Sequence, residues 1–482
     1  MSSEALVLDL DGTLIRNDLT HELIILCLRW KPHLLPIAIF KLLMSRSEGK
    51  RFLAELFHPL LDASVLPYNQ EVLDLARDYK ARGHKIEIVS GSDQLIVQKV
   101  GHFLESDLAA GSQPGRNLTS KNKADFLMER HAGNFVYAGN SKADYPVWRV
   151  AKKGYAVNAP ARSLKLSREN GDQVPVERLV QNKQTFRPLI KAMRLHQWAK
   201  NSLIFLVPGL FITQLGQSDW LSLLAAFLCF SIMASATYIL NDLFDIQDDR
   251  THRTKFKRPL ARGDLALPIA ILFVLLVIPL TLQASLMISL SFAFVLASYT
   301  LITLAYSFRL KRMAVLDVFI LASLFTIRVV AGAYVIGKPP SSWLLCFVGC
   351  FFLALAIGKR YIEVQGLQAK STEQVSGRGY QARDEYVLLA FGSATGFASV
   401  IALLIYGLLA PTIVFNFDIS VYFCSAILAA WMFRFWLLAG RGELNDDPVV
   451  FAIKDQVSFI TLSTIALIFL FDITRPLWIT LY

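Results

Sequence analysis

The sequence predicts two domains of different fold class: an N-terminal α/β domain with a Rossmann-like, doubly wound parallel sheet, and a C-terminal all-α bundle of about nine transmembrane helices. The 482 residues are 54% hydrophobic and 18% charged, whereas soluble proteins average roughly 45–50% and 25%. Charged residues are spread through residues 1–186, but from about Leu203 long apolar runs alternate with short polar loops. We therefore expect an α/β domain over 1–165, a linker over 166–186 and a membrane domain over 187–482.

Four short apolar runs in the first domain are typical of buried parallel strands. They are Ala5–Leu8, Lys85–Val89, Asn134–Tyr137 and Tyr155–Val157. Small or polar residues follow each run, and helical patterns separate the runs, as in a doubly wound sheet. Since ligands collect at the carboxyl ends of such strands, we expect the site of this domain there.

The residues after these strands resemble the haloacid dehalogenase superfamily across the whole first domain. Its four motifs occur in order: DxDGT at Asp9–Thr13, Ser90 after the second strand, a lysine, and a GDxxxD-like GNxxxD at Gly139–Asp144. The resemblance implies a magnesium-dependent phosphatase with a helical cap. The motif lysine is expected to be Lys123, at the start of a helical run, with Lys121 as the alternative.

The chemistry of such a phosphatase assigns a role to each residue. Asp9 would attack phosphorus and form an aspartyl-phosphate. Asp11, two residues on and on the same face of the extended chain, would protonate the leaving oxygen and later deprotonate water. Ser90 would hold a phosphoryl oxygen, and Lys123 would offset the negative charge. The expected magnesium ligands are Asp9, Asp11, Asn140 and Asp144.

Asn140 departs from the family pattern, which usually has an aspartate at this magnesium-ligand position. An amide oxygen still coordinates magnesium, but the change removes one negative charge and should weaken metal affinity. Asp144 remains as a supporting or substitute carboxylate. The alternative is a folded domain with weak catalysis.

Residues 15–80 lie between the first two motifs, where this family inserts a cap that selects the substrate. Within them, the run Ile24–Met44 is apolar but is interrupted by Trp30, Pro32, Pro36 and Lys41. It is too interrupted to span a bilayer. Two interpretations stay open: a segment lying on the bilayer surface, and a pair of helices in the core of the cap.

The second domain contains about nine apolar segments long enough to cross a membrane. They lie near 195–213, 220–240, 266–284, 287–307, 314–336, 342–358, 386–410, 419–438 and 457–477. The loops after the second, fourth and sixth segments are rich in lysine and arginine, and the intervening loops are not. This asymmetry predicts an integral protein of the cytoplasmic membrane, with the N-terminal domain cytoplasmic and the C-terminus on the opposite side. The net charge of +11 is thus explained by loop charges, and no nucleic-acid partner is expected.

The motif NDxxDxxxD at Asn241–Asp249 follows the second expected span. On a helix, Asp242, Asp245 and Asp249 would fall within an arc of roughly 60°. Three carboxylates on one face repel one another unless a cation lies among them, and magnesium bridging a diphosphate is the natural occupant. Downstream, cationic side chains are expected to hold phosphate oxygens: His252, Lys255 and Arg258. The alternative is a solvated acidic helix end followed by basic residues that only set the topology.

These residues resemble the UbiA-type superfamily of intramembrane prenyltransferases over about 187–480. Further matching residues, which the resemblance implies as phosphate- or substrate-binding, are Lys200, Asn241, Tyr306, Lys311, Lys359, Arg360 and Glu363. Asp317 belongs to the same pattern. The set is similar to the branch represented by decaprenyl-phosphate phosphoribosyltransferases, because aromatic prenyltransferases usually carry a second aspartate-rich motif where this chain has Lys359–Glu363. Arg253 departs from the branch pattern, which has proline there.

Arg328 lies inside the fifth apolar segment. A charge there costs a few kcal/mol on insertion scales, so we expect it to face the bundle interior and a polar ligand. A structural arginine that snorkels to the interface is the alternative.

The resemblances together imply a bifunctional, magnesium-dependent membrane enzyme. The membrane domain would transfer 5-phosphoribosyl from phosphoribosyl diphosphate to a polyprenyl phosphate, and the phosphatase would remove the 5-phosphate. The alternatives are an aromatic or quinone-type prenyltransferase with an unrelated phosphatase, and a phosphatase anchored by a non-catalytic bundle. The sequence is compatible with a homo-oligomer.

Overall fold

The computed structural model describes residues 4–166, 171–181, 186–368, 379–409, 418–444, 451 and 454–479. Contacts within the chain divide it into two compact units. The first unit comprises Met1–Met193 and Tyr238–Val274, and the second comprises Arg194–Thr237 and Leu275–Tyr482. The expected linker falls partly outside the described residues. Tyr238–Val274 runs from the end of one apolar helix to the first part of the next. The sequence pattern gave no indication that this segment groups with the N-terminal residues.

The first unit contains a six-stranded, fully parallel sheet in the order β3-β2-β1-β4-β5-β6. The strands are β1 Ala5–Leu8, β2 Lys85–Asp93, β3 Leu108–Ser112, β4 Phe135–Gly139, β5 Lys153–Val157 and β6 Val176–Val180. The four predicted strands are present. The other two lack the expected apolar run, since β3 is mostly small residues and the edge strand β6 exposes Glu177 and Arg178.

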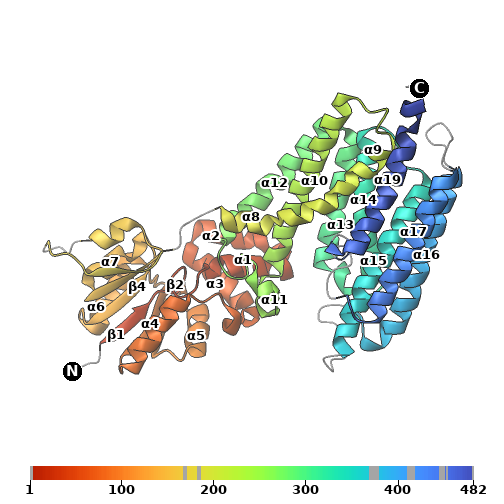
Figure 1. Cartoon of the computed structure of the whole chain (residues 1–482). Coiled ribbons are helices and arrows are strands. Elements are labelled where there is room, and N and C mark those ends of the chain that lie inside the picture. Colours follow the sequence, from red (N-terminus) through yellow and green to blue (C-terminus); the bar gives the residue numbers. More distant parts are fainter. Residues whose placement is uncertain are drawn as a thin grey trace. The chain divides into compact units, whose positions relative to one another are not determined.

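Helices cover both faces of this sheet (Figure 1). One face packs on α4 Gln70–Ala81 and α5 Gln94–Phe103, and the other packs on α6 Ser120–His131 and α7 Tyr145–Val150. Short 3-10 turns, Lys142–Asp144 and Ala161–Lys165, follow β4 and β5. The expectation of a doubly wound α/β sheet is therefore correct.

The sheet order makes β1 the point where the strand order reverses, with β2 on one side and β4 on the other. The backbone N–H of Asp9 still bonds the Ala138 carbonyl at 3.0 Å, so the loops after β1 and β4 begin side by side. Residues after β1, β2 and β4 therefore meet at one edge, as the general rule for ligand sites in α/β sheets predicts.

The chain between β1 and β2 is helical, as expected for residues 15–80. Its elements are α1 Leu19–Trp30, a turn at Pro32–Leu34, α2 Leu35–Met44, α3 Arg46–Phe57, and turns at His58–Leu60 and Ala63–Val65. Helix α4, at the end of the range, is the crossover to β2 and covers the sheet. The function of the inserted helices as a substrate-selecting cap stays a prediction.

The helix-pair interpretation of Ile24–Met44 is confirmed in part, whereas a position on the bilayer surface stays a prediction. Helix α1 contributes Leu23, Leu26 and Cys27 to the hydrophobic core, whereas α2 buries Ala38 and leaves most of its apolar side chains exposed. The run is thus a core helix followed by a surface helix.

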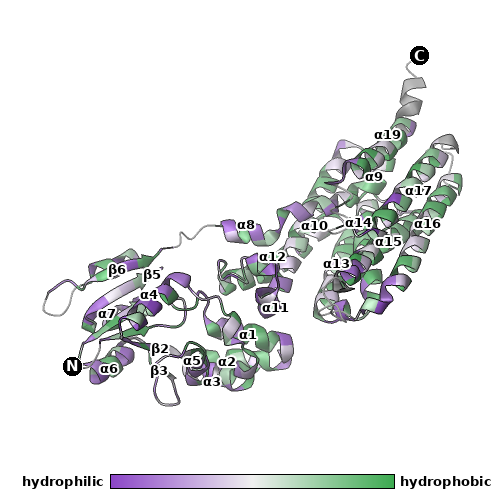
Figure 2. Ribbon diagram, turned by 60° about the horizontal axis from the view of Figure 1, so that its bottom comes forward, coloured by the Kyte–Doolittle hydropathy of each residue, from purple (hydrophilic) through white to green (hydrophobic). Residues whose placement is uncertain are grey.

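The second unit and the segment that interrupts it are helical. The elements are η6 Leu195–Phe205, α9 Leu206–Leu210, α10 Gln217–Phe244, α11 Ile246–Thr251, η7 Lys255–Lys257, α12 Leu267–Ile288, α13 Leu290–Phe308, η8 Leu310–Arg312, α14 Leu316–Val335, α15 Ser342–Gln368, η9 Ala382–Asp384, α16 Glu385–Leu409, α17 Asp418–Gly440 and α19 Gln456–Ile479. Figure 2 shows that the long helices among them are predominantly hydrophobic, whereas α11 is hydrophilic. The chain is an integral membrane protein.

The predicted number of nine spans is not confirmed. Among the described residues, seven helices are long and apolar enough to cross a membrane: α10 and α12 to α17. The expected first span, 195–213, is instead the 3-10 helix η6 followed by the five-residue α9. Polar Trp198, Lys200 and Asn201 lie in this segment, and a 3-10 helix of such length is unusual. The expected last span is also not among the seven, because its described apolar part, Gln456–Asp472, is shorter than a spanning helix.

Candidate active sites

The first candidate site is a buried carboxylate–lysine cluster at the end of β1. Lys123, from the first turn of α6, donates to the Asp9 carboxylate at 2.7 Å and to the Tyr137 hydroxyl at 2.9 Å. Tyr137 in turn donates to Asp144 at 2.6 Å. The structure therefore brings Lys123, and not the alternative Lys121, to Asp9. Tyr137 is a member of the cluster that the sequence gave no reason to single out, because it is one more apolar position in a buried strand.

The pKa values of this cluster depend on two opposing effects, burial and the neighbouring charges. Burial raises the pKa of Asp9 to about 6, although Lys123 acts to lower it. Burial alone would lower the pKa of Lys123, but the neighbouring Asp9 and Asp144 raise it above its ordinary value. Lys123 is therefore a permanent cation, which favours the ionised form of Asp9 needed for nucleophilic attack.

Asp11 lies in a separate polar environment. One carboxylate oxygen accepts from the backbone N–H of Leu19 at 2.9 Å, and the other accepts from the Ser92 hydroxyl. Burial, followed by the charge of Asp18, raises the pKa of Asp11 to about 7. A carboxyl group that titrates near neutral pH is suited to donating and then accepting a proton.

Ser90, the predicted phosphate ligand, lies at the same edge of the sheet and is buried. Its hydroxyl oxygen accepts from the backbone N–H of Ser92 at 3.2 Å. Ser92, not Ser90, contacts Asp11, and sequence reasoning missed it. The signal was available, since Ser92 belongs to the Ser90-Gly91-Ser92 run after the second strand.

Asn140 and Gly12 are in close contact. Gly12 has a φ of +72°, and a Cβ atom built on it would lie 2.0 Å from the Asn140 side-chain nitrogen. The DxDGT turn thus requires glycine both for its backbone conformation and for the space that Asn140 occupies.

Asp144 is held by hydrogen bonds that leave it poorly placed for metal ligation. One oxygen accepts from Tyr137, while the other accepts from the backbone N–H groups of Asn140 and Ser141 at 3.1 and 2.9 Å and from the Ser141 hydroxyl. With both oxygens already accepting hydrogen bonds, direct ligation of magnesium by Asp144 stays a prediction. The geometry agrees with the alternative of a supporting role, because Asp144 fixes the loop that carries Asn140.

The donors that remain suit magnesium. Asp9 and Asn140 follow neighbouring strands and present hard oxygen donors. Within the described ranges, no three His, Cys, Asp or Glu side chains cluster closely enough to hold a metal ion by themselves. Magnesium at this site would therefore need water and substrate phosphate as further ligands.

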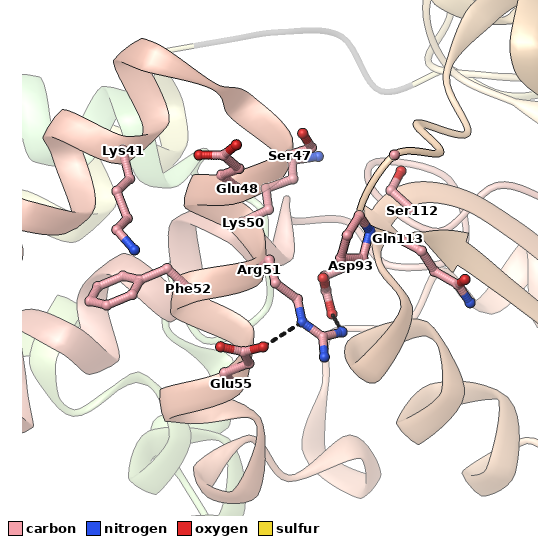
Figure 3. A pocket seen from close by; sticks show the side chains of 12 residues that line it. Lys41, Ser47, Glu48, Lys50, Arg51, Phe52, Glu55, Asp93, Ser112 and Gln113 are labelled. Carbon is pink, nitrogen blue, oxygen red and sulfur yellow. Dashed lines mark hydrogen bonds and ion pairs between the residues drawn. The ribbon is translucent and has the colours of Figure 1, made fainter.

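The first unit also has a cavity of about 340 Å³, which is lined by residues of α2, α3, the end of β2 and the loop after β3 (Figure 3). Its lining includes Lys50 and Arg51 of α3 and Asp93, which follows Ser92. Lys50 donates to the Gly91 carbonyl at 3.0 Å, and its charge acts to lower the pKa of Asp11. Arg51 contacts Glu55 at 2.7 Å and Asp93 at 3.5 Å. The cavity is lined by three basic side chains, Lys41, Lys50 and Arg51, and by three acidic ones, Glu48, Glu55 and Asp93.

The second candidate site is the aspartate-rich segment, and it differs from the single continuous helix that was expected. Helix α10 ends at Phe244 and α11 begins at Ile246, so Asp245 interrupts the helix with φ −94° and ψ 13°. Asp242 and Asp249 nevertheless converge on one guanidinium: Arg258 donates to them at 3.0 and 2.5 Å. In the structure an arginine, and not the predicted magnesium, lies between Asp242 and Asp249, and magnesium binding by the three aspartates stays a prediction.

Asp249 has the properties of a ligand-binding carboxylate. It is buried, and burial raises its pKa to about 6 against the opposing effect of Arg258. Its Oδ1 atom accepts no hydrogen bond from the described part of the chain; the Lys255 ammonium group lies 3.9 Å from it, whereas Arg258 bonds the other oxygen. An acceptor with unused capacity beside Asp242 suits a divalent cation.

The cations expected to hold phosphate have different environments. Arg258 pairs with the aspartates, so its binding of phosphate requires that this ion pair rearrange. Lys255 is 41% exposed at its side chain. The His252 ring nitrogen lies 3.3 Å from the Thr254 backbone N–H. Asn241 lies in the last turn of α10, where its carbonyl accepts from Asp245 N–H at 2.9 Å.

Helix α1, within the same unit, holds the aspartate-rich segment in place. Glu22 and Arg250 form a bidentate ion pair at 2.6 and 2.9 Å, and both side chains are less than 5% exposed. Arg29, at the other end of α1, donates to the Phe244 carbonyl at 2.7 Å and to Asp248 at 2.8 Å. Sequence patterns did not reveal these contacts, because the paired residues are more than 200 positions apart.

In the second unit, Arg328 faces the bundle interior, as predicted. It is 4% exposed and donates to Asn201 at 2.8 Å, to the Tyr299 hydroxyl at 3.3 Å and to the Leu324 carbonyl. Its guanidinium also lies near the Phe230, Tyr299 and Phe325 rings. These contacts account for the buried charge without a ligand, and they contradict the snorkelling alternative. Lys200 lies 5.8 Å from the centre of the Phe325 ring.

A second polar cluster in this unit is formed by residues from the end of α13, the start of α14 and the last third of α15. Arg360 donates to Asp317 at 2.6 Å, to Glu363 at 2.7 Å and to the Tyr306 hydroxyl at 3.3 Å. Tyr380 completes it by donating to Asp317 at 2.7 Å. The structure therefore brings together three predicted substrate-binding residues and one that was missed. Lys359, on α15, is half-buried, and Lys311 lies in η8.

The same unit carries an apolar cavity of about 530 Å³ between α13, α14 and α15. Its lining is aliphatic and aromatic, with Ile302, Phe319, Ile327 and Leu353 among its members. Such a surface suits a hydrocarbon chain and not a sugar phosphate.

The fold and these sites define a polytopic membrane protein with carboxylate clusters suited to magnesium and phosphate. The UbiA prenyltransferase family model matches residues 202–467. The chain therefore belongs to the UbiA prenyltransferase family.

One relative is the uncharacterized protein y4nM of Sinorhizobium fredii, which is 35% identical over 94% of this chain and 88% of its own length. The nodulation protein NoeC of Azorhizobium caulinodans is 30% identical over 58% of this chain and 92% of its own length. Decaprenyl-phosphate phosphoribosyltransferase of Mycolicibacterium smegmatis is 38% identical over 37% of this chain, and the match spans 57% of that enzyme.

Solved structures resemble each part of the chain. A UbiA homolog from Archaeoglobus fulgidus bound to GPP and Mg²⁺ is 16% identical and covers 59% of this chain and 96% of its own, with a TM-score of 0.46. A HAD family hydrolase from Salmonella enterica serovar Typhi is 16% identical and covers 36% of this chain and 70% of its own, with a TM-score of 0.27.

Proposed function

We propose that the membrane part transfers 5-phosphoribosyl from phosphoribosyl diphosphate to a polyprenyl phosphate, and that the N-terminal part then removes the 5-phosphate. The observation that carries the first step is the pair Asp242 and Asp249, buried beside a cation at the end of a membrane helix. The named activity of the mycobacterial relative, 38% identical over part of its length, supports the choice of substrates.

In the transfer step, an oxygen of the lipid phosphate attacks the anomeric carbon of the sugar, and the bond from that carbon to diphosphate breaks. Once Arg258 leaves the pair, Asp242 and Asp249 would hold magnesium together with water and substrate, and Asp245 would have to move toward them to act as a third ligand. The ion would supply charge neutralisation for the departing diphosphate. Arg258, released from the aspartates, would contact phosphate oxygens. The apolar cavity lined by Ile302 and Leu353 would receive part of the polyprenyl chain.

In the phosphatase step, Asp9 attacks the phosphorus of the 5-phosphate and the ester oxygen leaves with a proton from Asp11. Asp11 then takes a proton from water, which attacks the aspartyl-phosphate and releases inorganic phosphate. Lys123 keeps Asp9 ionised. Asp9 and Asn140 would hold magnesium, which supplies additional positive charge at the phosphoryl group.

The product of both steps is a polyprenyl-phosphoryl-ribose. A quinone-type prenyl transfer, which the family name also covers, would instead consume a prenyl diphosphate and an aromatic acceptor.

The test uses the full-length chain in lipid nanodiscs with magnesium and a polyprenyl phosphate. Phosphoribosyl diphosphate labelled in the ribose is added, and the extracted lipids are analysed by mass spectrometry. The proposal predicts a labelled lipid-linked ribose without the 5-phosphate. No labelled lipid from the native chain, together with prenylation of an aromatic acid from a prenyl diphosphate, would establish the quinone-type alternative.

A further inference from the structure

Helix α2 exposes a continuous apolar stripe. At 100° per residue, Ile37, Ile39, Phe40, Leu43 and Met44 fall within an arc of roughly 160°. Phe40, Leu43 and Met44 are 63%, 79% and 73% exposed, which is the reverse of the pattern expected for a helix of a soluble domain.

The opposite face of α2 is fixed in the fold. Ala38 is fully buried, and a Cβ atom on Gly49 of α3 would lie only 2.6 Å from Leu42. Lys41 places its ammonium group 4.4 Å from the centre of the Phe52 ring of α3. The stripe is therefore held outward by close packing on α3, and α2 cannot rotate to hide it.

The neighbours of α2 in the chain adjoin the membrane. Helix α1 precedes it by one short turn, and Arg29 of α1 bonds the carbonyl of Phe244, the last residue of the membrane-spanning helix α10. The first unit also includes the start of the next spanning helix, α12. With ten residues, α2 is roughly 15 Å long and too short to cross a bilayer.

Basic side chains flank the stripe. Lys31 lies just before α2, Lys41 lies within it and Arg46 lies just after it. An apolar face with lysine and arginine at its borders is the pattern of a helix that lies in the headgroup region of an anionic membrane.

We propose that α2 is an interfacial helix, which inserts its apolar stripe into the surface of the bilayer and holds the cavity lined by Lys50 and Arg51 against lipid headgroups. Lys41 joins the two features, because it belongs to α2 and lines the cavity together with Lys50 and Arg51 (Figure 3). The substrate class that follows is a phosphate ester carried by a membrane lipid. This last step rests on the proposed phosphatase, whereas the membrane contact of α2 does not.

The first experiment measures the depth of α2. A small fluorescent amino acid replaces Leu43 in the full-length chain, reconstituted at one copy per nanodisc with nitroxide-labelled lipids. We expect strong quenching by a nitroxide near the headgroup. The matched control at Met128, an exposed apolar residue of α6, should remain unquenched, and Leu275, in the spanning helix α12, should be quenched by a nitroxide deep in the acyl chains.

Absence of quenching at position 43, with quenching at position 275, would overturn the proposal. Protection of position 43 only when two copies share a disc would identify a second copy of the chain as the partner of the stripe, and would overturn it equally.

The second experiment measures the consequence for substrate choice. In the double variant Phe40→Glu/Leu43→Glu, turnover of a lipid-linked phosphate ester should fall roughly tenfold or more, because the cavity loses its high local concentration of substrate. Hydrolysis of soluble p-nitrophenyl phosphate should stay unchanged, and Met128→Glu should alter neither activity. Equal loss on both substrates would overturn the link between α2 and substrate choice. If the native chain hydrolyses neither ester, the proposed phosphatase fails, while the quenching result still decides the position of α2.

Discussion

The buried ion pair between Glu22 and Arg250 allows a prediction whose size follows from the structure. Glu22→Gln removes one charge with little change of shape. Because both side chains are less than 5% exposed, the cost should be that of an uncompensated buried charge, about 3–5 kcal/mol, and not the 0–1 kcal/mol of a surface pair. In the variant, the uncharged amide at position 22 can accept at most one of the two hydrogen bonds from Arg250, which also keeps its bond to the Ala261 carbonyl at 3.1 Å.

Hydrogen exchange measured by mass spectrometry tests this cost where it should appear. The segment 246–264 is held to α1 by this pair, so its amide hydrogens should exchange roughly a hundredfold faster or more in the variant, since each 1.4 kcal/mol is a factor of ten. The control is Asp264→Asn, which removes an ion pair to Arg16 whose side chains are 23% and 32% exposed; it should change exchange by less than about fivefold. Equal effects of the two variants would refute the reasoning.

Three further predictions concern the proposed sites. Asp242→Asn or Asp245→Asn should abolish lipid-linked product while the chain still inserts; near-normal product from both would exclude the magnesium–diphosphate role. Asn140→Asp should lower the magnesium concentration needed for phosphate release, because a carboxylate binds the ion more strongly than an amide; an unchanged or higher requirement would show that Asn140 is not a ligand. Asp9→Asn should leave ribosyl transfer intact but cause the 5-phosphorylated lipid to accumulate, which mass spectrometry distinguishes by one phosphate group; identical lipids from both chains would separate the phosphatase from this product.

Local sequence patterns sufficed wherever one short segment determines the structure. The strand before Asp9, the glycine turn at Gly12 and the helix start near Lys123 each follow from a few neighbouring residues. Because parallel strands end at one edge, their order along the chain already predicted that Asp9, Ser90 and Asn140 would lie near one another.

The missed features depend on partners that are distant in the sequence. Tyr137 joins the Asp9 cluster only because α6 brings Lys123 over β4. The interruption at Asp245 could not be read from helical periodicity, which continues through the motif. Similarly, the 3-10 conformation of Leu195–Phe205 is not encoded in its hydropathy, so the first expected span is not among the seven long apolar helices of the described residues.

Helix α1 links the two carboxylate clusters of the first unit through a single turn. Its first backbone N–H, at Leu19, donates to Asp11 at 2.9 Å, and Glu22, three residues later, pairs with Arg250, the residue after Asp249. A shift of this turn must therefore alter the surroundings of both carboxylates, since neither contact involves a flexible intermediate. Loss of the Glu22 charge should consequently reduce ribosyl transfer and phosphate release together, whereas Asp9→Asn should affect phosphate release alone. If Glu22→Gln impaired only one of the two activities, the position of α1 would not couple the two sites.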